Sequence, residues 1–154
     1  MQTLSIRPIG AIRIGEEGPY VELEPPYLPA LKGLEYYSHV HILWWFSRRD
    51  NPADRGVTQV HPAHGAAPGP MGVFASRSPC RPNPIALSTA EITFVDAGRG
   101  RIGLDWTDAE DGTPVVDIKP YSPGLDRVED CREPVWHVDW PGSYEASRAA
   151  GNKY

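Results

Sequence analysis

Residues 72–88 have the sequence GVFASRSPCRPNPIALS, and this stretch decides how the chain is organised. Pro79, Pro82 and Pro84 each have φ fixed at about −65°, and each favours an extended conformation of the residue before it. Neither a helix nor a central strand accepts that spacing, so we expect a stiff, irregular loop over residues 78–84 between strand-like segments. Its polar side chains are Arg77, Ser78, Arg81 and Asn83. Guanidiniums and an amide on a rigid loop favour an anionic ligand held in one geometry; an ordinary connector with solvated arginines is the alternative.

Length and charge limit the classes of function. The chain has 154 residues and a mass of 17.0 kDa, enough for one domain with its own core. A net charge of −5 argues against a protein that binds nucleic acid over its whole surface, but it is compatible with a local basic cleft. The two cysteines suit a reducing compartment, and the first residues lack the pattern of a signal peptide. No apolar run is long enough to span a membrane, so we expect a cytoplasmic protein.

Frequent Pro and Gly divide the chain into short segments rich in β-branched and aromatic residues, which predicts an all-β protein with long loops and few short helices. The predicted strands are 4–14, 20–23, 36–46, 71–75, 85–95, 101–106 and 115–118. Only residues 28–34 and 144–150 have helical character. Asp111-Gly112 lies between two predicted strands and indicates a tight hairpin turn. Short strands at this spacing are typical of an antiparallel barrel or a sandwich.

A second informative segment, residues 111–123, has the sequence DGTPVVDIKPYSP. On a strand, Asp117 and Lys119 share one face, while the apolar residues at 116 and 118 share the other. The proline that follows ends the strand and leaves Asp117, Lys119 and Tyr121 at its rim. A carboxylate, an ammonium and a phenol together can position a polar substrate and handle a proton. A weak surface ion pair at a strand end is the alternative.

The strand over residues 36–46 suggests two further features. His39 and His41 alternate, so their imidazoles share a face; with one more ligand such a pair holds a metal in several β-barrels, and a metal-binding or non-catalytic barrel remains an alternative. Trp44-Trp45-Phe46 points to both faces, and the outward ring needs a cover, for which a partner subunit is a reasonable choice. No glycine fingerprint of a Rossmann domain follows a strand.

Residues 72–88 resemble the signature of small β-barrel methyltransferases that use S-adenosylmethionine, the TsaA-like or TrmO-like family. Residues 111–121 resemble the second signature of that family, and residues 33–46 resemble a third. Their order and spacing agree over about residues 5–125. The resemblance implies a single compact antiparallel β-barrel that forms a homodimer and binds S-adenosylmethionine without a Rossmann fold. It also implies a tRNA partner, methylated on the exocyclic nitrogen of threonylcarbamoyl-adenosine beside the anticodon.

The same resemblance assigns roles to residues. The implied cofactor-binding residues are Arg77, Ser78, Arg81, Asn83, Leu87, Asp117, Ile118, Lys119 and Pro120. An arginine of the loop is suited to pair with the methionine carboxylate of the cofactor. Asp117, Lys119 and Tyr121 are the catalytic candidates, which would orient the acceptor and help to remove its proton. No metal is implied.

Several positions depart from the family pattern. Ala86 replaces a glycine, Cys80 replaces an aromatic residue, and Ser47-Arg48 stands where a histidine often follows the aromatic strand. A counterpart of the C-terminal domain of longer members is not recognisable. We therefore expect a barrel domain over residues 1–125 and a tail over residues 126–154 that packs on the barrel or on a dimer partner. A methyltransferase of the same fold that acts on a small molecule or another RNA remains an alternative.

Overall fold

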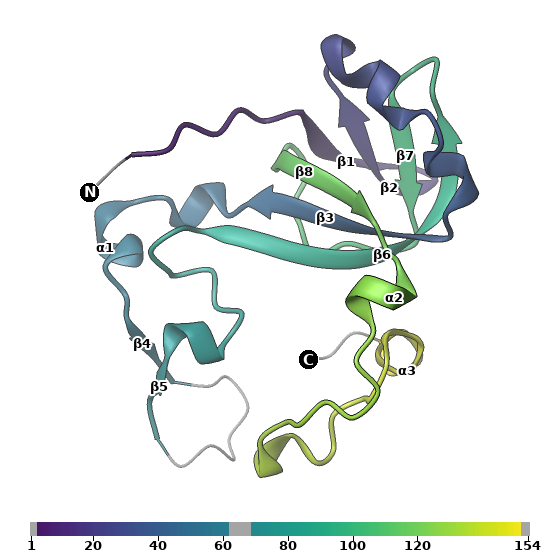
Figure 1. Cartoon of the computed structure of the whole chain (residues 1–154). Coiled ribbons are helices and arrows are strands. Elements are labelled where there is room, and N and C mark those ends of the chain that lie inside the picture. The colour runs from purple at the N-terminus through teal and green to yellow at the C-terminus, as the bar shows by residue number, and fades with distance from the viewer. Residues whose placement is uncertain (1–2, 62–68, 152–154) are drawn as a thin grey trace.

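The computed structural model describes residues 3–61 and 69–151, and within them six antiparallel strands close into a barrel (Figure 1). The strands are β1 (Gly10–Gly15), β2 (Gly18–Leu23), β3 (His39–Trp45), β6 (Ile85–Asp96), β7 (Arg101–Leu104) and β8 (Pro114–Pro120). Their order around the barrel is β1-β2-β7-β6-β3-β8, and β8 closes back onto β1. The predicted all-β barrel is confirmed.

Alternation along the strands builds the core. On β3, Val40, Ile42 and Trp44 are buried, while the residues between them are only partly buried on the outer face. The other strands contribute buried residues in the same way, and the central ones are Ile12, Val21, Ile102 and Val115. The side chains that fill the barrel are almost all aliphatic, so ligand-binding groups must lie on its outer face or at its ends.

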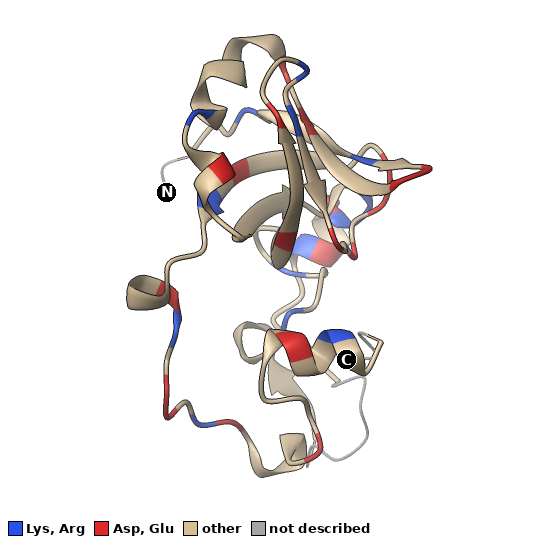
Figure 2. Ribbon diagram, turned by 90° about the vertical axis from the view of Figure 1, so that its right-hand side faces the viewer, with Lys and Arg blue, Asp and Glu red and all other residues tan. Residues whose placement is uncertain are grey.

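Short elements fill the connections. The described part of the chain contains a small sheet of β4 (Gln59–Val60) and β5 (Met71–Gly72), and the helices α1 (Pro52–Arg55), α2 (Pro123–Asp126) and α3 (Tyr144–Ala149). Single 3-10 turns or short 3-10 helices occur at Pro25–Leu31, Leu34–Tyr36, Ser47–Arg49, Val73–Ala75 and Val135–His137. Both the segment with β4 and β5 and the C-terminal tail extend from the same side of the barrel (Figures 1 and 2). Among the described residues, no helix is long and apolar enough to cross a membrane.

Several sequence-based strand boundaries were wrong, and three of them differ by three residues or more. Residues 4–9 precede β1 and form no strand; Pro8 has no N–H to donate to a ladder, although Ile9 donates to the Val115 carbonyl and accepts from the Glu24 N–H. β3 begins only at His39, because a 3-10 turn occupies residues 34–36. β5 is limited to two residues and is followed directly by another 3-10 turn. The helix predicted at 144–150 is present as α3.

The turn at Asp111-Gly112 is present, but it does not form a hairpin. Gly112 has φ of +79°, the left-handed conformation for which glycine is suited. The flanking strands do not pair with each other: β7 pairs with β2 and β6, whereas β8 pairs with β1 and β3. The turn is instead tied to β1, since the Ile14 N–H donates to the Asp111 carboxylate at 3.0 Å. It therefore positions β8 for closure of the barrel.

The aromatic run of β3 is covered by this chain's own residues. Trp44 is buried and its indole donates to Ser88, and Phe46 packs against Trp44 and the core. The outward ring, Trp45, donates to the carboxylate of Asp50 at 3.0 Å and lies under the guanidinium of Arg55. This chain's own residues therefore contact the outward ring, and the contacts of Trp45 do not test whether a partner subunit also covers it.

Candidate functional site

The loop before β6 is held by its own backbone. The carbonyl of buried Pro84 accepts from the Phe46 N–H at 2.8 Å, which anchors the loop to the end of β3. Arg81 donates to the carbonyls of Ser76 and Ser78, and Arg77 donates to the Leu87 carbonyl at 3.1 Å. Within residues 3–61 and 69–151, neither guanidinium has a carboxylate within ion-pairing distance. Both charges are thus held in place and are free to meet an anion.

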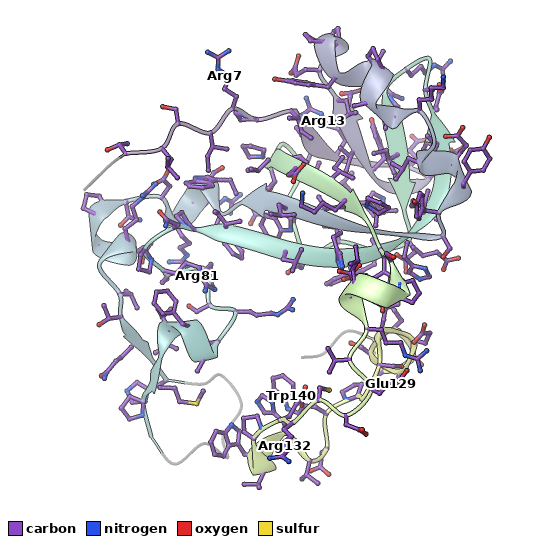
Figure 3. The ribbon with its side chains drawn as sticks, viewed as in Figure 1. Arg7, Arg13, Arg81, Glu129, Arg132 and Trp140 are labelled. Carbon is purple, nitrogen blue, oxygen red and sulfur yellow. The ribbon has the colours of Figure 1, made fainter. Side chains whose placement is uncertain are left out.

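These side chains surround one cavity, which we call the loop pocket. It has a volume of about 450 Å³ and is lined by four of the predicted residues, Arg77, Arg81, Asn83 and Leu87. Phe46, Phe74, Ile85 and Ala86 supply its apolar walls, and Asp108 supplies a carboxylate. Ser78 lies outside it, in the lining of a neighbouring cavity that Arg77 also reaches. Figure 3 labels Arg81 beside β6, on the side of the barrel from which the tail extends.

The loop pocket is connected to β8 by one row of side chains on the outer face of the barrel. Leu43 of β3 is directly opposite Leu87 of β6 on one side and opposite Asp117 of β8 on the other. Paired residues in antiparallel strands present their side chains on the same face. Since neighbouring strands are about 4.8 Å apart, the row from Leu87 to Asp117 spans roughly 10 Å.

Asp117 and Lys119 share the outer face, as the alternation predicts, and they form the surface ion pair that was the alternative to a catalytic role. The Lys119 ammonium lies 2.8 Å from one carboxylate oxygen of Asp117, and the other oxygen accepts from the Ile118 N–H. The hydrogen bond that Lys119 donates to the Asp117 carboxylate raises the pKa of Lys119 above its ordinary value, so the lysine remains protonated at neutral pH. A β-bulge at Val116 makes Val115, rather than Val116, the buried neighbour.

The structure does not bring the β8 residues into the loop pocket. Asp117, Ile118 and Pro120 line a separate cavity of about 710 Å³ with Tyr27 and the residues around it. Tyr121 lies further along, 5.4 Å from the ring of His41 and 6.4 Å from that of His39, and it lines a third cavity with Tyr144. The three catalytic candidates follow one edge of the outer face, but Tyr121 does not join the ion pair.

The two histidines share the outer face as predicted. His39 contacts Ser38 through Nδ1, whereas His41 contacts Thr89 through Nδ1 and Asp126 through Nε2, at 3.4 Å. In the part of the chain that the structure describes, no three histidine, cysteine or acidic side chains are grouped as metal ligands. The metal alternative therefore gains no support from the described residues.

Sequence reasoning missed two contributors to this region. Asp108 accepts a hydrogen bond from Ser88 at 2.8 Å and so fixes one wall of the loop pocket; it lies in an irregular segment with no motif to mark it. Phe74 is 81 % exposed beside Arg77, although the sequence placed it in a strand. An exposed aromatic ring cannot be told from a buried one in a short apolar run.

Comparisons with known proteins match this region and the barrel. Residues 6–127 match the model of the tRNA-methyltransferase O N-terminal domain. A probable S-adenosyl-L-methionine-binding protein of Pyrococcus horikoshii is 40 % identical over 121 residues, covering 78 % of this chain and 84 % of that protein. A putative S-adenosylmethionine-dependent methyltransferase of Pseudomonas aeruginosa is 40 % identical over 124 residues, covering 79 % of this chain and 52 % of that protein.

Solved structures agree with the sequence matches. A crystal structure of TrmO superposes with a TM-score of 0.68 at 34 % identity, covering 87 % of this chain and 64 % of that one. TrmO from Pseudomonas aeruginosa gives 0.67 at 33 % identity, covering 88 % and 62 %. The chain thus spans a little under two thirds of these structures. On the strength of the match over residues 6–127, the chain belongs to the family of the tRNA-methyltransferase O N-terminal domain.

Proposed function

We propose that this chain is an S-adenosylmethionine-dependent methyltransferase that methylates the exocyclic nitrogen of threonylcarbamoyl-adenosine in cytoplasmic tRNA. The family and the names of the relatives bear out the predicted enzyme class and cofactor. The tRNA substrate is supported by the family name and by the TrmO structures that the chain resembles. The particular nucleoside is our proposal.

One observation carries the proposed function: Arg77 and Arg81 lie at the loop pocket, bonded to backbone carbonyls and without carboxylate partners in the described chain. A guanidinium in that state suits the methionine carboxylate of the cofactor. The apolar walls at Phe46 and Leu87 suit its less polar parts, Asn83 lines the same pocket, and Ser78 lines the neighbouring cavity that Arg77 also reaches. When bound, the cofactor supplies a methyl group already activated by its sulfonium, so alignment of the acceptor is the protein's main task.

We assign the acceptor side to β8. The protonated Lys119 keeps the Asp117 carboxylate oriented on the outer face, in the row that leads to Leu87. From that position Asp117 accepts a hydrogen bond from the acceptor's N–H and takes its proton, while Lys119 and Tyr121 hold polar groups of the substrate. Ile118 and Pro120 support this edge of the site from the adjoining cavity.

We also propose the bounds of the domain and the assembly of the chain. We assign the methyltransferase domain to residues 1–125 and treat residues 126–154 as a tail. A homodimer is supported by apolar side chains that are exposed and line neither the loop pocket nor the cavity beside it, among them Leu4 at 79 % and Ile14 at 52 %. Sedimentation of the purified chain as a dimer or a monomer is the corresponding measurement.

The decisive experiment compares two RNA substrates. Purified protein is incubated with S-adenosylmethionine and an anticodon stem-loop, either with or without the threonylcarbamoyl group on its adenosine, and methylated nucleosides are identified by mass spectrometry. We expect methylation of the modified RNA only. Methylation of a small nucleoside but of neither RNA would support the small-molecule alternative, which the net charge of −5 favours. Transfer to none of them would contradict the proposed function.

A further inference from the structure

A second cavity, of about 670 Å³, lies between the C-terminal tail and the segment around the loop, and we call it the aromatic pocket. The segment around the loop contributes Met71, Phe74 and Arg77, and the tail contributes Trp136, His137 and Trp140. Figure 3 labels Trp140 on the tail, below the barrel. These tail residues lie beyond the segment that matches the family model, which ends at residue 127.

The lining of the aromatic pocket is suited to a flat ring. The rings of His137 and Trp140 stack on each other at 3.8 Å with 7° between their planes, and Phe74, 81 % exposed, also lines the cavity. Stacked and offset aromatic faces of this kind bind planar π systems. These aromatic residues come from two separate segments, the tail and the segment around the loop, and a cavity lies between them.

The polar atoms of the pocket narrow the ligand further. The Trp136 indole N–H is buried and has no acceptor among the residues that the structure describes. A buried donor without a partner costs free energy, which a ligand acceptor would recover. The Glu133 carboxylate, 3.4 Å from His137 Nδ1, also lines the cavity and can accept from an amino group. A ring with an acceptor and an amino group on its edge has the chemistry of a nucleobase.

We infer that the aromatic pocket binds an unpaired base of the RNA, next in sequence to the adenosine that is methylated. The inference rests on the proposed function. Arg77 lines both cavities, so a ligand in the aromatic pocket adjoins the loop pocket. Of the cofactor candidates on the loop, Arg77 and Ser78 line the aromatic pocket, whereas Arg81, Asn83 and Leu87 line the loop pocket and not the aromatic pocket. The proposed function places the single base of the cofactor in the loop pocket, so we assign the aromatic pocket to a base of the substrate.

An RNA loop is the appropriate source. Sequence-specific RNA recognition targets unpaired bases, which are splayed out and stacked on aromatic rings. Stacking also suits a protein with a net charge of −5, because it does not depend on neutralising many phosphates. The tail thereby supplies this chain with its own contact to the RNA.

The test uses three variants of the full chain. Trp140→Ala removes the stacking face, Trp140→Phe keeps a ring, and Val138→Ala is the matched control on the same tail, 81 % exposed and outside the pocket. Affinities are measured for the threonylcarbamoylated stem-loop and, separately, for S-adenosylhomocysteine. We expect Trp140→Ala to weaken RNA binding on the order of tenfold, with cofactor-product affinity within about twofold of wild type. Trp140→Phe and Val138→Ala should bind RNA nearly as the wild type does.

An abasic stem-loop completes the design. Removal of the neighbouring base should weaken binding to the wild type but cause little further loss in Trp140→Ala, because the two changes remove the same contact. Equal RNA affinity of Trp140→Ala and wild type, while the wild type still methylates this RNA, would overturn this inference alone. Loss of S-adenosylhomocysteine binding in Trp140→Ala would overturn it by assigning the pocket to the cofactor's adenine. If the wild type neither binds nor methylates the RNA, the proposed function fails and this inference fails with it.

Discussion

Arg77 is the residue on which the cofactor proposal depends most directly. Its guanidinium is held by one hydrogen bond, to the Leu87 carbonyl, and it lines both the loop pocket and the aromatic pocket. Arg77→Ala should weaken S-adenosylhomocysteine binding roughly 10- to 100-fold, since a hydrogen bond to a charged group contributes about 1.5–3 kcal/mol. The melting temperature should change little, because the lost bond is exposed. Calorimetric titration and a thermal melt measure the two quantities.

The control for that substitution is Arg99→Ala. Arg99 is also exposed, with a side chain 75 % accessible, but it belongs to the turn between β6 and β7 and pairs with Asp96. Cofactor affinity should be unaffected there. If both variants bind S-adenosylhomocysteine as tightly as the wild type, the cofactor site is not at the loop pocket. The sequence predicted Arg77 because prolines fix the loop around it; it did not predict Asp108 or Phe74, whose positions depend on how the loop packs.

Among the elements, α3 shows how the tail is attached to the barrel. The Tyr144 hydroxyl donates to the Asp105 carboxylate at 2.7 Å and accepts from the Glu91 N–H, and Arg148 donates to the same carboxylate at 2.8 Å. Tyr144→Phe should lower the free energy of unfolding by about 1–2 kcal/mol, measured by urea denaturation at neutral pH. Tyr36→Phe, at a side chain 86 % exposed, is the control and should be neutral. Equal stability of the two variants would mean that this contact does not hold the tail.

The same contact predicts a dependence on alkaline pH. Burial, together with the hydrogen bond to Asp105, raises the pKa of Tyr144 to about 12. The unfolded chain loses this proton near pH 10, so between about pH 10 and 12 the native state holds more protons than the unfolded state. The stabilisation that comes from the raised pKa of Tyr144 is fully present below about pH 10 and is lost as the pH rises towards 12. The stability difference between wild type and Tyr144→Phe should therefore shrink over that range; a difference independent of pH would contradict the assignment.

Strands were predictable where β-branched and aromatic residues are frequent. β6 and all of β3 after its first three predicted residues are confirmed for that reason, but the inner face of β6 carries Ser88 and its outer face carries Leu87, so polarity alone does not identify the buried side. The sequence could not locate the bulge at Val116, which shifts the register against β3 and moves Val115 into the core. It also predicted a hairpin at Asp111-Gly112, because the local turn chemistry is the same whether or not the flanking strands pair. Which strands meet is decided by barrel closure, a property of the whole sheet.

For the whole molecule, the proposed RNA substrate has to be reconciled with a net charge of −5. Most cations near the site are already neutralised by carboxylates; the ion pairs are Arg48–Glu110, Arg49–Asp54, Arg55–Asp50 and Lys119–Asp117. Figure 2 shows Lys and Arg interspersed with Asp and Glu over the ribbon. Few positive charges are left for phosphates, so base contacts must supply much of the affinity.

This balance predicts a shallow dependence of RNA binding on salt. Each phosphate neutralised on a single strand contributes about −0.7 to the slope of log K against log salt concentration, so two or three contacts give a slope of roughly −1.5 to −2. Fluorescence anisotropy of the labelled stem-loop, titrated between about 50 and 200 mM KCl at saturating S-adenosylhomocysteine, measures it. A slope several times steeper would show that phosphate contacts dominate the binding of RNA. The ion pairs between these arginines and their carboxylates would then have to break when the RNA binds. A shallow slope that Trp140→Ala leaves unchanged, while affinity falls, would place the lost energy in stacking rather than in charge.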